Sequence, residues 1–126
     1  MKDSKFINYR FEDLEVWKIG MKIISEIYHL TKEFPKTELF ALTDQLKRAA
    51  TSIVLNIAEG SGQPTPKGFI LYLQRAKSSV LECVACLKIA TQEKFVSPNR
   101  LSALEDLLKE EYFKIIALAK SLNKNT

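Results

Sequence analysis

The chain has 126 residues, the size of one domain, and its hydrophobic share of 46% is enough to build a core. Two cysteines are too few for a disulfide framework, and no apolar run approaches the roughly 18–20 residues that span a bilayer. No apolar signal core follows Met1. We therefore expect a single cytoplasmic domain covering residues 1–126. The net charge of +4 arises in residues 64–126, which hold ten basic and six acidic residues, whereas residues 1–63 hold nine of each, and this excess favours a polyanionic partner.

The first helix is predicted over residues 12–33, where two apolar seams run through one segment. Two seams indicate apolar neighbours on more than one side of the helix. Pro35 ends the helix, because the residue before a proline avoids helical backbone angles. The seams are Leu14, Trp17, Met21, Ile24, Tyr28 and Thr31, and Val16, Gly20, Ile23, Ile27, Leu30 and Phe34.

The second helix is predicted over residues 43–60, with Thr43 as its N-cap and Gly60 and Gly62 as its stop signals. The alanines on its core face let a neighbouring helix approach closely. That face consists of Leu46, Ala49, Ala50, Ile53, Ile57 and Ala58.

The third helix, residues 66–94, starts with Thr65 as N-cap and Pro66 at the first helical position, and the fourth, residues 98–122, repeats this signal with Ser97 and Pro98. Four helices with short links predict an all-α fold, an antiparallel up-down-up-down four-helix bundle. The third helix has a heptad seam and the fourth an apolar stripe: Phe69, Leu73, Ala76, Val80, Cys83, Leu87 and Ala90, and Leu101, Leu104, Leu108, Ile115, Leu118 and Leu122.

Two short motifs resemble known catalytic or metal-binding patterns but are incomplete. Glu26 and His29 match the Glu-x-x-His motif of di-iron bundles, yet such a site needs two of these motifs and His29 is the only histidine. Cys83 and Cys86 spell C-x-x-C, but Cys83 falls mid-helix on the heptad seam, so we interpret both as core thiols. The sequence therefore predicts no enzyme, no catalytic residue, no metal site and no cofactor.

A row of polar residues lies beside the core face of the second helix, and a similar flank is expected on the third. Two facing rows of this kind predict an interhelical hydrogen-bond network that fixes helix register. Catalysis by Glu59 and Glu82 is the alternative, although no nucleophile, metal set or histidine converges on them. The predicted network consists of Gln45, Ser52, Asn56 and Glu59, with Arg48 close by, and Arg75, Ser79 and Glu82.

Three lysines of the third helix, Lys67, Lys77 and Lys88, lie within about 80° of arc. Such a row is suited to follow a phosphate backbone, and it is equally typical of a solvated helix face. Arg100 is a further candidate for phosphate contact, and Lys47 and Arg48 on the second helix are weaker ones.

Several sequence runs resemble a bacterial family of four-helix-bundle proteins whose founding members are encoded in intervening sequences of 23S ribosomal RNA genes. The similarity extends from about Phe11 to Leu122. Departures are Gln63, where relatives often have a basic residue, and Ser78, where they often have glycine. The runs are Leu14-Glu15-Val16-Trp17, Gln45-Leu46-Lys47-Arg48-Ala49-Ala50, Asn56-Ile57-Ala58-Glu59-Gly60 and Ala76-Lys77-Ser78-Ser79-Val80.

This resemblance implies a four-helix bundle without enzymatic activity and, in some relatives, a ring-shaped homopentamer. Related proteins accompany reverse transcriptases in diversity-generating retroelements and bind nucleic acid through a basic surface. We therefore expect a homo-oligomer that binds RNA or DNA, with a reverse transcriptase as one type of partner protein. The alternative is a protein-interaction scaffold without nucleic-acid contact. Spare apolar surface on Val16, Ile23, Ile27 and Leu30 is the expected subunit interface, unless a wide core absorbs it.

Overall fold

The computed structural model describes residues 9–124, and in this part of the chain it contains helices and no strand. The predicted all-α four-helix bundle is confirmed, and each helix begins and ends within three residues of its expected bounds. The helices are α1 (Glu15–Thr31), α2 (Leu42–Ser61), α3 (Pro66–Gln92) and α4 (Pro98–Asn123), with short 3-10 turns η1 (Arg10–Asp13) and η2 (Lys36–Glu38).

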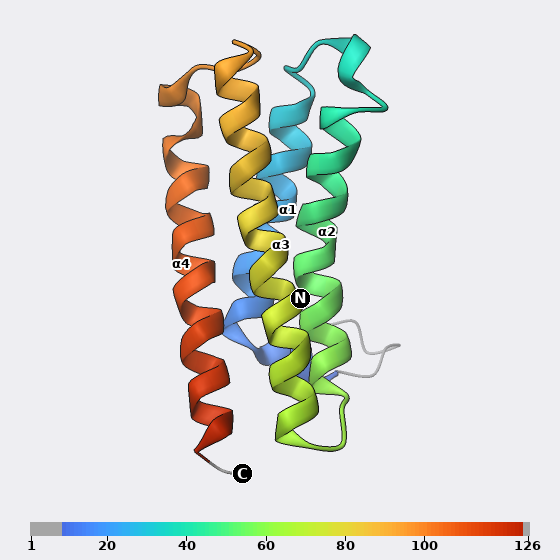
Figure 1. Ribbon diagram of the computed structural model, residues 1–126, viewed down its shortest axis with the longest axis vertical. Coiled ribbons are helices and arrows are strands. Elements are labelled where there is room, and N and C mark those ends of the chain that lie inside the picture. Colours follow the sequence, from blue (N-terminus) through green and yellow to red (C-terminus); the bar gives the residue numbers. More distant parts are fainter. Residues whose placement is uncertain (1–8, 125–126) are drawn as a thin grey trace.

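The four helices run side by side along the long axis of the molecule, and their links alternate between its two ends (Figure 1). Helices that follow one another in sequence pack against one another, and α4 closes the bundle against α1. The diagonal pairs α1–α3 and α2–α4 do not approach as closely. Each helix therefore has two neighbours and directs one side at a shared core. None of the helices within residues 9–124 combines the length and apolar character that crossing a bilayer requires.

The helix ends follow the expected capping chemistry only in part. The hydroxyl oxygen of Thr65 accepts a hydrogen bond from the Gly68 amide at 3.0 Å, and Pro66 occupies the first turn of α3 as predicted. The expectation for Thr43 is wrong, because α2 already begins at Leu42 and Thr43 is buried inside it. The Leu42 amide instead donates to the Glu38 carboxylate at 3.4 Å, so a side chain from the preceding turn caps α2.

Gly60 does not stop α2, contrary to the expectation, because the helix continues through it to Ser61. Neither Gly60 nor Gly62 has a positive φ angle. A Cβ atom on Gly60 would lie 2.8 Å from Cβ of Tyr72 and 2.9 Å from Cδ1 of Phe69, both on α3. Gly60 is therefore the point at which the α2 backbone touches α3, and its missing side chain allows the two helices to pack.

Every residue of the predicted α3 seam is buried, so its heptad pattern identified the core face of this helix. The expectation of spare apolar surface on α1 is wrong, because Val16, Ile23, Ile27 and Leu30 are all within the core. The other seam of α1 lies at the edge, with Met21 and Tyr28 each more than 40% exposed. The apolar residues that were the candidate subunit interface are therefore buried inside the bundle.

Glu111 on α4 is the exception to this apolar core. Its side chain is fully buried, and neither carboxylate oxygen has a hydrogen-bond partner among the described residues. Gly20 on α1 makes room for it, because a Cβ atom there would lie 3.1 Å from Oε2 of Glu111. Burial, reinforced by the negative charges of Glu110 and Glu15, raises the pKa of Glu111 to about 8. The carboxyl group is therefore mostly protonated at neutral pH.

Glu111 makes the stability of the bundle depend on pH. Its pKa is near 4.5 without these effects, so the folded chain holds this proton between pH 4.5 and about 8 while the unfolded chain releases it. The free energy of unfolding should therefore fall as pH rises through this window, by on the order of a few kcal/mol. Urea denaturation of the wild type and Glu111→Gln at several pH values measures the difference directly.

Glu111→Gln should gain stability over the wild type as pH rises, whereas Glu110→Gln, a change at an exposed neighbour on the same helix, should gain far less, because it removes only a secondary cause of the raised pKa. A stability difference between wild type and Glu111→Gln that is the same at pH 5 and pH 9 would contradict this account.

The contact of Gly60 with α3 predicts opposite behaviour for two neighbouring glycines. Gly60→Ala should lower the free energy of unfolding by about 1–3 kcal/mol, because the added methyl group overlaps Tyr72 and Phe69. Gly62→Ala should stay within about 1 kcal/mol of the wild type, since its Cβ would meet only the Glu59 carbonyl oxygen, at 3.7 Å. Chemical denaturation of both variants checks this, and equal losses would show that helix propensity matters here and packing does not.

Candidate nucleic-acid interface

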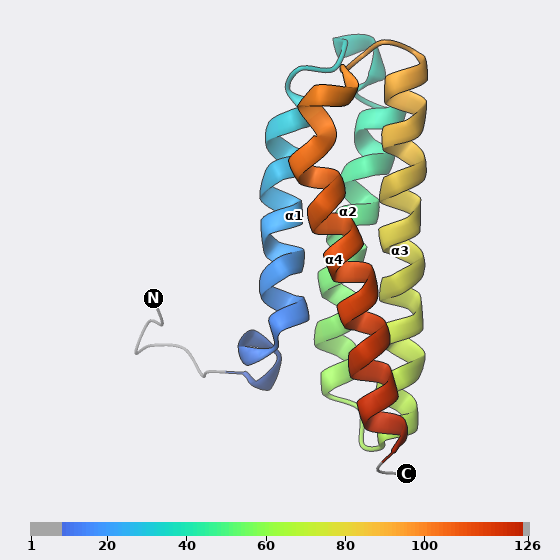
Figure 2. The same ribbon diagram turned by 90° about the vertical axis from the view of Figure 1, so that its left-hand side faces the viewer.

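One end of the α3–α4 face contains basic side chains and no acidic ones. Residues 66–81 of α3 and 112–124 at the end of α4 include no Asp or Glu. Because α3 and α4 are antiparallel, these segments lie at the same end of the bundle (Figure 2). We call them together the acid-free end. Its basic residues are Lys67, Arg75, Lys77, Lys114, Lys120 and Lys124.

Most of this positive charge has no carboxylate partner among residues 9–124. Lys114 is the exception, because its ammonium group donates to the Glu15 carboxylate of α1 at 2.5 Å. No described carboxylate lies within 4.0 Å of Lys67, Lys77 or Lys120. The guanidinium of Arg75 lies 4.7 Å from the centre of the Tyr72 ring, a contact that leaves its charge in place. Positive potential therefore accumulates at the acid-free end.

The structure places the other predicted phosphate contacts beside carboxylates or on another face. Arg100 donates from Nε and Nη2 to one oxygen of Glu33, at 3.0 and 2.8 Å. The three remaining basic residues that were predicted to contact phosphate lie outside the acid-free end, and each has a partner within the protein. They are Lys88 with Glu105 at 3.9 Å, Arg48 with Asp44 at 3.9 Å, and Lys47 with its ammonium 4.8 Å from the centre of the Tyr28 ring.

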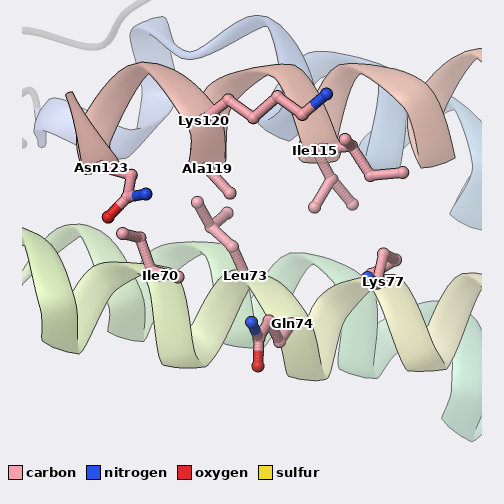
Figure 3. Close-up of a pocket in the computed structure, with 9 residues that line it drawn as sticks. Ile70, Leu73, Gln74, Lys77, Ile115, Ala119, Lys120 and Asn123 are labelled. Atoms are coloured by element: carbon pink, nitrogen blue, oxygen red, sulfur yellow. The ribbon is translucent and has the colours of Figure 1, made fainter.

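A groove of about 360 Å³ runs between α3 and α4 at the acid-free end (Figure 3). Its accessible floor is aliphatic and consists of the partly buried Ile70, Ile116 and Ala119, and beneath it the fully buried Leu73 of α3 reaches toward Ala119 of α4 (Figure 3). Lys77 and Lys120 belong to opposite helices and both line it, and no lining residue is acidic. Lys77 was among the phosphate contacts predicted from the sequence, and Lys120 was not. The available signal was the charge order of α4, in which every acidic residue precedes residue 112.

The predicted polar rows meet across α2 and α3 at two separate points. Gln45 donates from Nε2 to the Glu82 carboxylate at 2.6 Å, and the hydroxyl of Ser79 donates to that of Ser52 at 2.9 Å. Asn56 supports the second point by donating to the Ser52 carbonyl oxygen at 2.8 Å. These bonds fix the register of α2 against α3.

Three other members of the rows do not extend this network. Arg75 packs on Tyr72, Arg48 pairs with Asp44 on its own helix, and Glu59 is exposed, with its carbonyl oxygen accepting a bond from Gln63. The two bonded points therefore remain separate, and nothing at either resembles a nucleophile beside a base.

The two thiols of the C-x-x-C run are free and buried in the core, as interpreted from the heptad seam. Burial, with the nearby charges of Cys86 and Glu82, raises the pKa of Cys83 to about 12. Burial and Glu82 also raise the pKa of Cys86. Thiols held in this protonated form are poor nucleophiles. Residues 9–124 also contain no group of three or more side chains arranged to hold a metal ion.

Comparison with known proteins places this bundle in a family. A crystal structure of a protein of unknown function from the S23 ribosomal protein family of Bacteroides thetaiotaomicron matches it with a TM-score of 0.77 and 21% sequence identity, covering 83% of this chain and 98% of that one. This similarity shows the shared fold. No curated protein gives a significant match. The family described as 23S rRNA-intervening sequence protein matches residues 12–117, most of the sequence, and the chain therefore belongs to that family.

Proposed function

We propose that this protein is a non-catalytic, self-associating bundle that binds the phosphate backbone of a structured RNA through its acid-free end. The observation that supports this most directly is the group of basic residues from two helices, with Lys67, Lys77 and Lys120 lacking any described carboxylate partner. A phosphate that meets such a lysine releases condensed counterions, which favours binding at low salt.

The start of α3 adds to the positive potential. The first turn of α3 contains Lys67 and no acidic residue, so the partial positive charge of the helix N-terminus is not neutralised. Lys67 thus lies on a helix end that favours anions, with Lys77 about three turns further along α3 and Lys120 added from α4. Lys88 and Arg100 would contribute only after giving up exposed ion pairs, which are individually weak.

Self-association would use the outer face of α3 in place of the α1 seam. Leu71, Leu81 and Ile89 are each about half exposed and fall within about 80° of arc on this helix. An aliphatic row of this kind on the outside of a small bundle favours contact with another protein surface. The same row supports the alternative, a scaffold that binds a different partner protein and no nucleic acid.

The proposed interface predicts a charge effect that depends on position. In a titration with an RNA hairpin followed by fluorescence anisotropy, Lys77→Glu with Lys120→Glu should weaken binding about tenfold or more and reduce the slope of log K against log salt by about two. The matched control is Lys94→Glu with Lys109→Glu, which makes the same change in net charge outside the acid-free end. Equal losses in both double variants, or no wild-type binding at low salt, would contradict the proposal.

The α3 row predicts a matching effect on solution mass. The wild type should sediment above its 14.4 kDa chain mass, and Leu81→Lys should shift it toward that mass by placing a charge in the contact. Leu55→Lys on α2, a residue of similar exposure, should leave the mass unchanged. A wild type that sediments as a 14.4 kDa monomer at every concentration would exclude self-association.

A further inference from the structure

The groove at the acid-free end has a feature that phosphate contacts do not use. The surface between Lys77 and Lys120 is hollow, and its accessible lining is aliphatic, with Ile70 of α3 and Ile116 and Ala119 of α4 only partly buried (Figure 3). Phosphate oxygens gain nothing from such a surface, because they lose hydration without finding a donor there. A ligand that has an apolar face next to a negatively charged group fits this groove better than a phosphate alone.

We propose that the groove binds one unpaired nucleotide of the RNA, with its base on the aliphatic floor and its flanking phosphates at Lys77 and Lys120. This inference rests on the proposed function and specifies which part of the RNA the acid-free end recognises. A base in a duplex has both faces covered by its neighbours, so only an unpaired base offers an apolar face to a protein groove.

The lining of the groove matches the parts of a nucleotide. Its volume of about 360 Å³ falls within the range of small-ligand sites. The amides of Gln74 and Asn123 also line it, and an amide presents the paired donor and acceptor that base edges require. The two lysines come from opposite helices, so positive charge is available on either side of a bound base. The absence of any acidic lining residue favours an anion over a cationic or neutral occupant.

A substitution that fills the groove without changing its charge can distinguish binding of a base from attraction of phosphate. Ala119→Leu adds aliphatic volume at the floor and changes no charge. Ala117→Leu is its matched control, the same change two residues away on an exposed side of α4 that does not line the groove. The probes are a fully paired RNA hairpin and the same hairpin with one bulged adenosine, titrated at one salt concentration by fluorescence anisotropy. Circular dichroism of both variants checks that the bundle remains folded.

The wild type should bind the bulged hairpin about fivefold more tightly than the paired one, because an aliphatic floor buries one face of the base without the larger gain of stacking on an aromatic ring. Ala119→Leu should remove this preference and leave the affinity for the paired hairpin unchanged, whereas Ala117→Leu should keep it. Equal wild-type affinity for both hairpins would overturn the nucleotide site while leaving the proposed RNA binding intact. If Ala119→Leu weakened the binding of both hairpins equally, the groove would contact the RNA backbone and the nucleotide site would also be overturned. No binding of either hairpin would remove the proposed function and this site together.

Discussion

The requirement that four apolar stripes share one core determines the arrangement of everything else in this molecule. On α3 the stripe is continuous, and burying Leu73 and Val80 fixes the rotation of the helix about its own axis. Once that rotation is fixed, Lys77 must lie at the edge facing α4, and Leu81 must face outward. The basic groove and the exposed aliphatic row are therefore consequences of core packing, and a shift in the packing of α3 would displace both.

Glu111 shows how tightly the shared core constrains the sequence. The steps of the α4 stripe from Leu104 through Leu108 to Ile115 require a core residue at position 111, and the chain has a carboxylic acid there. Gly20 on the opposing helix leaves the space that this side chain occupies. A protonated acid is tolerated in an apolar site far better than a carboxylate. The bundle thus accommodates the acid by keeping its proton, at the expense of stability in alkaline conditions.

The sequence was sufficient for the fold and for part of the candidate site. Periodicity located the helices and the α3 core face because both depend on spacing along one helix. It did not show which seam of α1 would be buried, nor that Gly60 would touch Tyr72, because these depend on where a neighbouring helix lies. The pairing of Arg100 with Glu33 spans 67 residues and depends on packing in the same way. The predicted α4 stripe has no apolar residue between Leu108 and Ile115. Only the structure shows that Glu111 fills this core position.

The central functional claim is that the acid-free end of the α3–α4 face contacts RNA. Ultraviolet crosslinking of the wild-type protein to a bulged RNA hairpin, followed by mass spectrometry of the crosslinked peptides, tests it most directly. The account predicts crosslinks within residues 66–81 and 112–124, with those near Ile70 and Ala119 requiring the bulge. Crosslinks confined to α1 and α2 would contradict this claim. So would the predicted crosslinks if they persisted when the protein is saturated with a competing polyanion.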